Sequence, residues 1–193
     1  FFVEKISPNI APYDHEFNTK FSSSPFLKDL DQDKYFIYLR SVKNEMKLYR
    51  AKNIPLFTEL TNKSQKFGEI AAQMMVTIDG EEKTLQQAAV YLKYTDRSKR
   101  QEVFEKVNHR RAADIEKLDL LLDELIEKRQ EVAKNTDFEN FRDYKFQSMG
   151  RFDYTKEDCF QFHESIAKEI VPLLAEIQQE RKQKLGLEVL KPW

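Results

Sequence analysis

Apolar side chains recur at intervals of three and four residues through most of this 193-residue chain, a period that places them on one face of an α-helix. Glycine and proline, which interrupt helices, are scarce at 4 and 6 residues. The pattern predicts an all-α fold of long antiparallel helices, each burying one face. Its clearest run is Ile115, Leu118, Leu122, Leu125, Arg129 and Val132.

Local signals divide the first two thirds of the pattern into helices. Prolines and serines in the first 34 residues predict short helices joined by turns. Asn53, followed by Pro55, predicts the start of a helix that ends near Met74. Asp96 predicts the N-cap of a helical region over residues 96–134, with an irregularity near Ala113.

The last long helix has signals at both ends and one inside. Thr155 and Asp158 have the spacing of a capping box, so the helix is expected to begin there. Pro172 removes a backbone donor within the helix and predicts a bend. Gly186 can adopt the left-handed conformation that ends helices.

One segment departs from the helical pattern. Around residues 75–85, Val76 and Ile78 alternate with polar residues and precede Asp79-Gly80, a dipeptide suited to a tight two-residue turn. The sequence therefore predicts one small β-hairpin in an otherwise helical chain.

The charge balance excludes several classes of function. Lys and Arg number 32 against 33 Asp and Glu, so no excess of positive charge favours nucleic acid or an anionic membrane. No apolar run approaches the roughly 20 residues that cross a bilayer. The single cysteine, Cys159, cannot form an internal disulfide. We therefore expect a cytoplasmic protein that binds neither nucleic acid nor membrane.

The three histidines do not have the spacing of a zinc site. Helical zinc sites of peptidases place two histidines four residues apart with a glutamate after the first. His15 and His163 are each followed by glutamate but lack the second histidine, and His109 stands apart. For His163 we favour a histidine at the edge of the core, bonded to a neighbouring helix, over a ligand.

Four residues are candidates for lining a cleft. Arg129 occupies a core position of its series, where a charge needs a partner. We favour an ion pair with a carboxylate of another helix, and an anchor facing a cleft is the alternative. Tyr144, Arg151 and Tyr154 belong to a polar and aromatic region near a predicted turn, a kind of surface that often lines binding sites.

Short stretches in serial order resemble one family. In sequence they run FVEKISP from Phe2, MVTIDG from Met75, TLQQA from Thr84, NFRDY from Asn140, GRFDYT from Gly150 and LKPW from Leu190. Their order and spacing over nearly the whole chain resemble the oligoendopeptidase F family, related to the thimet-oligopeptidase-like zinc metallopeptidases.

The resemblance implies an intracellular zinc endopeptidase that hydrolyses short peptides in a channel. Residues 1–193 would be a single helical segment cut at both ends, forming one wall of the cleft. The zinc would be bound by the zinc-bearing remainder of the same chain, so no catalytic or metal-binding residue is assigned here. The oligopeptide substrate and that remainder are the expected partners. The alternative is a helical protein-interaction module, a role that amphipathic helices also serve.

Overall fold

The computed structural model describes all residues, Phe1–Trp193, and confirms an all-α fold with one β-hairpin. The chain forms two compact units, Phe1–Ala71 with Ile115–Phe152 and Ala72–Asp114 with Asp153–Trp193. None of its helices is both long and apolar enough to span a bilayer. The longer elements are α1 (Ser7–Ser22), α2 (Phe36–Leu48), α3 (Asn53–Ala72), β1 (Met75–Ile78), β2 (Glu81–Thr84), α4 (Leu85–Ala89), α5 (Arg97–Ala112), α6 (Ile115–Asn135), α7 (Phe141–Ser148), α8 (Lys156–Ser165) and α9 (Val171–Lys184).

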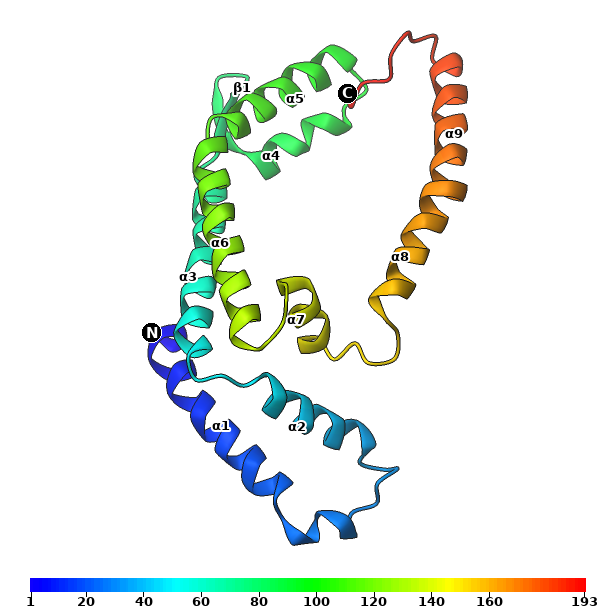
Figure 1. Cartoon of the computed structure of the whole chain (residues 1–193). Helices are drawn as coiled ribbons and strands as arrows, with labels where there is room; N and C mark the ends of the chain where they lie inside the picture. Colours follow the sequence, from blue (N-terminus) through cyan, green and yellow to red (C-terminus); the bar gives the residue numbers. More distant parts are fainter. The chain divides into compact units, whose positions relative to one another are not determined.

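Helices α3 and α6 lie side by side at the centre of the first unit (Figure 1). Lys63 of α3 pairs with Glu124 of α6 at 2.5 Å, and Lys128 of α6 pairs with Glu59 of α3 at 3.0 Å. Residue numbers rise along one helix as they fall along the other, so the pair is antiparallel as predicted. Between and beside the two helices lies a buried cluster of Leu56, Val132, Ala133 and Tyr144.

Asn53, at the start of α3, joins this helix to the end of α6. Its side chain is fully buried, and the amide group donates to the carbonyl oxygen of Val132 over 3.2 Å. The Asn53 Oδ1 atom accepts a hydrogen bond of 2.6 Å from the amide of Asn135. The residue that the sequence marks as a helix start therefore also makes a buried polar contact between helices, which no local pattern could predict.

The first helix differs from the predicted series of short helices. α1 has 16 residues and continues through Pro12. A π-helical turn, Phe2–Ile6, directly precedes α1, so Pro8 and Pro12 each remove one backbone donor from a continuous helical stretch. α1 packs against α2, and the amide of Asn18 donates to Glu45 over 2.9 Å. Packing between helices here outweighs the local proline signal.

The hairpin of the second unit confirms the turn prediction. β1 and β2 pair antiparallel, with Ile78 opposite Glu81. Asp79 and Gly80 have φ angles of 53° and 81°, so both turn residues are left-handed, as the twist of a two-residue hairpin requires. The inner face of the hairpin packs on α4 and α5 in a buried cluster of Val76, Ile78, Ala88, Val103 and Val107.

The predicted irregularity near Ala113 is a break between two helices. α5 begins at its predicted cap, where the Asp96 carboxylate accepts from the backbone N–H groups of Ser98 and Lys99. It ends at Ala112, and α6 begins at Ile115. Asp114 is buried in the break and pairs with Arg110. The two compact units meet in the sequence at this point.

The last helical segment has the predicted cap, bend and stop. Thr155 and Asp158 form a capping box at the start of α8. A π-helical turn, Ile166–Ile170, separates α8 from α9, and Figure 1 shows the ribbon bending there. Pro172 follows in the first turn of α9 and cannot donate to the preceding turn. Gly186, at φ 62°, follows the end of α9.

Candidate functional site

Arg129 has no carboxylate partner, so the predicted ion pair is wrong. Its guanidinium carbon lies 5.9 Å from the centre of the Phe141 ring, in cation–π geometry. The reason is the rotation of α6 about its axis. Leu121, Leu125, Val132 and Ala133 face the interior, whereas Arg129 lies at the edge and is half-buried. There the guanidinium keeps its contact with water and needs no buried counter-charge.

Tyr144 and Arg129 both contact the ring of Phe141. The Tyr144 side chain is 7% exposed and packs edge-to-face on Phe138, with ring centres 5.8 Å apart, and its ring centre lies 5.7 Å from that of Phe141. Burial raises the pKa of the Tyr144 hydroxyl above its ordinary value. The structure thus gives Tyr144 a packing role that fixes the position of Phe141 under Arg129.

Neither of the other two predicted residues shares the Phe141 ring with this pair. The Arg151 guanidinium lies 5.5 Å from the centre of the Phe146 ring, near the end of α7. Tyr154 is exposed and belongs to the second compact unit. The structure therefore brings Arg129 and Tyr144 together and sets Arg151 against another ring of α7, whereas Tyr154 belongs to the other unit. Contact of these residues with a peptide remains a prediction.

The histidines lie on three different helices. His15 of α1 stacks on Tyr49 with ring centres 3.9 Å apart, and its Nδ1 atom is buried without a hydrogen-bond partner. His109 is on α5. His163 is exposed on α8, so its predicted place at the core edge is wrong, because no helix of the second unit packs closely enough to bury it. No group of three or more His, Cys, Asp or Glu side chains could hold a metal ion.

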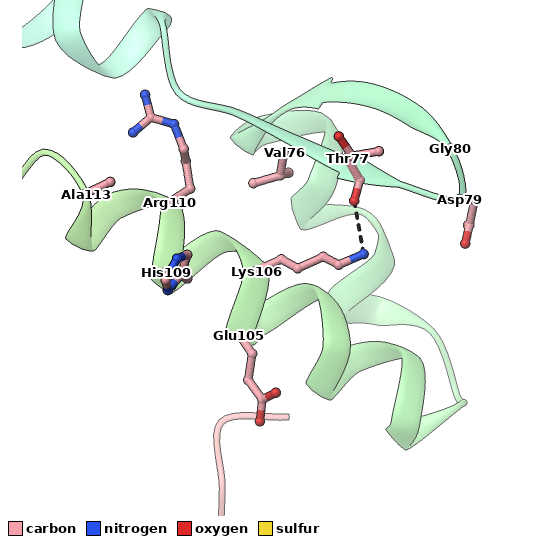
Figure 2. Close-up of a pocket in the computed structure, with 9 residues that line it drawn as sticks. All are labelled: Val76, Thr77, Asp79, Gly80, Glu105, Lys106, His109, Arg110 and Ala113. Atoms are coloured by element: carbon pink, nitrogen blue, oxygen red, sulfur yellow. Dashed lines mark hydrogen bonds between the residues drawn. The ribbon is translucent and has the colours of Figure 1, made fainter.

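A shallow pocket of about 590 Å³ lies between the hairpin and α5 (Figure 2). The Lys106 ammonium donates to the carbonyl oxygen of Thr77 over 3.1 Å and pairs with Glu102 at 2.7 Å. Because Ile78 and Glu81 flank a two-residue turn, the backbone groups of Thr77 face away from β2, and Lys106 covers that open edge. Arg110 is paired with Asp114.

Sequence reasoning missed this pocket. It is formed by residues about 30 positions apart, so only the packing of β1 on α5 brings them together. Alternation along β1 could have indicated that Thr77 faces outward, since Val76 and Ile78 face the core. Of the cationic groups in the pocket, Lys106 and Arg110 are already bonded within the chain. His109 also lines the pocket, and no hydrogen bond or ion pair joins it to Glu105 or Asp79.

Known peptidases resemble this chain in sequence and in fold. The family model described as peptidase family M3 matches residues 90–193. A structure described as an oligoendopeptidase F of Bacillus anthracis strain Ames aligns with a TM-score of 0.90 and 26% identity, over 99% of this chain and 35% of that chain. A structure of PZ peptidase A with an inhibitor aligns with a TM-score of 0.90 and 25% identity, over 99% of this chain and 34% of that one.

A further structure described as an oligoendopeptidase F gives a TM-score of 0.89 at 25% identity, over 98% of this chain. This chain spans about a third of the length of the solved structures that it matches. A search of curated proteins found no match.

Proposed function

The chain belongs to peptidase family M3, and from this premise we propose that it is part of a cytoplasmic, zinc-dependent oligoendopeptidase that hydrolyses short peptides. One observation carries the proposal. Almost every residue aligns with solved peptidases of the oligoendopeptidase F type, at TM-scores of 0.89 to 0.90. The alignment accounts for only a third of those chains, which is why we propose a larger parent protein.

Within that parent, residues 1–193 form a single helical segment that serves as one wall of the peptide channel. The zinc-bearing remainder of the same chain supplies the metal and the groups that activate water, since the histidines of this segment lie on separate helices. The contribution of this segment is to limit access, so that oligopeptides enter and folded proteins do not.

The chain exposes more surface than a compact protein of its mass, which supports the proposal that further protein packs around it. The chain exposes 14304 Å², whereas a compact monomer of 23.0 kDa is expected to expose about 9,600 Å². Two separate compact bodies sharing this mass in proportion to the two units would together expose about 11,600 Å². An excess of about 2,700 Å² therefore remains however the units are arranged.

Two arginines of the first unit have chemistry that suits a peptide-facing wall. Arg129 lies over Phe141 and Arg151 over Phe146, so each planar group rests on an aromatic face. Neither makes an ion pair within the chain, which leaves their N–H donors available to peptide carbonyls or a terminal carboxylate. We propose these two residues as wall contacts, with Tyr144 fixing Phe141 and Tyr154 as a further contact.

The proposal is tested with a fluorogenic oligopeptide of about ten residues and two proteins, the parent and the isolated 193-residue chain. We expect the parent to cleave the peptide, to lose activity with a chelator and to regain it with zinc. The isolated chain is expected to be inactive with or without zinc. A folded protein containing the same cleavable sequence is the control for size selection and should resist. Metal-dependent turnover by the isolated chain, or none by the parent, would refute the proposal.

A helical interaction module remains the second candidate, because exposed apolar helix faces are also what such a module presents. The same assay separates the two functions. An interaction module would leave the folded, zinc-loaded parent without peptidase activity.

A further inference from the structure

Helix α9 and the turn before it carry an apolar stripe that their own compact unit leaves open. Leu173, Leu174 and Ile177 of α9 and Ile170, the last residue of the π-helical turn, are spaced by three and four residues, so they share one side of the helical segment. Their exposed fractions lie between 50% and 54%. We call these four residues the α9 stripe. Four adjacent, half-exposed aliphatic side chains on one helix face form a surface that favours burial against protein.

Nothing within the second compact unit covers the stripe. No residue of α8, of the π-helical turn or of α9 is buried, and the main contacts of each are with its neighbours in the sequence. The opposite side of α9 carries polar residues such as Gln179 and Lys182. A single helix in water is marginal without tertiary packing, so the stripe marks the side on which packing is missing.

We propose that the α9 stripe is the surface on which the zinc-bearing remainder of the parent polypeptide packs. This inference rests on the proposed function and names the residues through which the wall is held. The stripe lies inside the part of the chain that the family model matches, and about two thirds of each matched peptidase lies outside the aligned segment. A partner on the same polypeptide is therefore the occupant with the highest effective concentration.

The amount of exposed surface favours this occupant over a second copy of the chain. A standard protein–protein interface removes about 800 Å² from each partner, whereas the excess here is about 2,700 Å². Other half-exposed aliphatic residues lie elsewhere, including Ile37 on α2 and Ile126 on α6. A two-fold contact through α9 alone would leave those surfaces open, and a large continuous polypeptide could cover them together.

The test compares two substitutions on α9 in two proteins. Ile177→Glu places a charge in the stripe, and Gln179→Glu places the same charge on the opposite side as a matched control. In the isolated chain both variants are expected to shift Tm by less than about 1 °C, because both positions face water. In the parent, Ile177→Glu is expected to lower Tm by about 5 °C, and Gln179→Glu to leave it unchanged.

Hydrogen exchange provides an independent readout. The amides of α9 should exchange slowly in the parent and quickly in the isolated chain. If the parent with Ile177→Glu fails to fold, Ile177→Ala takes its place, with a smaller loss of Tm in the parent and none in the isolated chain.

Three results would overturn the inference. Equal Tm shifts for Ile177→Glu and Gln179→Glu in the parent would mean that the stripe is not covered there. Slow exchange of α9 amides in the isolated monomer would mean that the stripe needs no remainder. A dimer of the isolated chain that Ile177→Glu dissociates, with an unchanged parent, would assign the stripe to a second copy. Peptidase activity of the unsubstituted parent is measured separately, so failure of the proposed function is distinguished from failure of the stripe.

Discussion

The α3–α6 pair and the α8–α9 segment have similar apolar patterns in the sequence and opposite environments in the structure. The first pair closes over a buried cluster and is joined by Asn53 and by two ion pairs between helices. The second segment has no buried residue, and the ion pairs Lys168–Glu169 and Lys184–Glu180 lie within it. Periodicity identifies the face of a helix that needs covering, but it does not say whether the chain itself supplies the cover.

The largest expected effect comes from placing a charge in the closed pair. Val132 is fully buried on α6, so Val132→Asp should cost about 4 kcal/mol or more of unfolding free energy, because the carboxylate would have no partner. Leu122→Asp on the same helix is the control. Leu122 is 50% exposed, so this substitution should lower the unfolding free energy by less than about 1 kcal/mol. Urea unfolding of this chain measures both, and equal losses would contradict the observed orientation of α6.

That control also shows where sequence reasoning stopped. The helix over residues 115–135 was predictable from its spacing, but the sequence places Leu122 and Arg129 in the core series. The structure buries Leu121 instead and leaves Arg129 at the edge. A stripe two or three residues wide permits several rotations of a helix, and the partner helix selects one of them. The missing ion pair of Arg129 follows from this difference.

Turns, caps and helix ends were predicted correctly because a few adjacent residues determine them. The Asp79-Gly80 turn, the Thr155 capping box and the Gly186 stop each depend on bonds within about five residues. The pocket beside β1 and the Asn53 contact depend on residues about 30 and 80 positions apart, so no local pattern specifies them. The fold class was therefore predictable, and the grouping of the candidate site residues was not.

A smaller effect is expected from the polar contact that joins α3 to α6. Asn53→Ala leaves the Asn135 amide without its acceptor in a partly buried place and should cost about 1–3 kcal/mol. Asn62→Ala is the control, because Asn62 is on the same helix and its hydrogen bond to Glu4 is exposed. That change should cost less than about 0.5 kcal/mol. If urea unfolding gives the two variants the same loss, the buried contact does not hold the pair together.

The smallest expected effect is a dependence on pH that belongs to the α3–α6 pair. The Lys63 ammonium, 2.5 Å from Glu124, donates a hydrogen bond that lowers the pKa of that carboxyl below its ordinary value of 4.5. A carboxyl with a lowered pKa in the folded state stabilises the fold above pH 4.5, and this contribution is lost as the pH falls through the folded value. In acid, the contact between the two helices should therefore weaken.

Two glutamine variants separate this effect from general acid unfolding. Glu124→Gln removes the titrating group, so the difference in urea midpoint between this variant and the unsubstituted chain should be present at pH 7 and should shrink as the pH falls below 4.5. Glu180→Gln is the control, because Glu180 pairs with Lys184 one turn away on α9 and joins no second helix. Its unfolding curve should follow that of the unsubstituted chain from pH 7 to pH 3. If Glu124→Gln instead remains parallel to the unsubstituted chain over this range, the ion pair does not stabilise the α3–α6 contact, and the contrast with α8–α9 rests on the buried cluster and Asn53 alone.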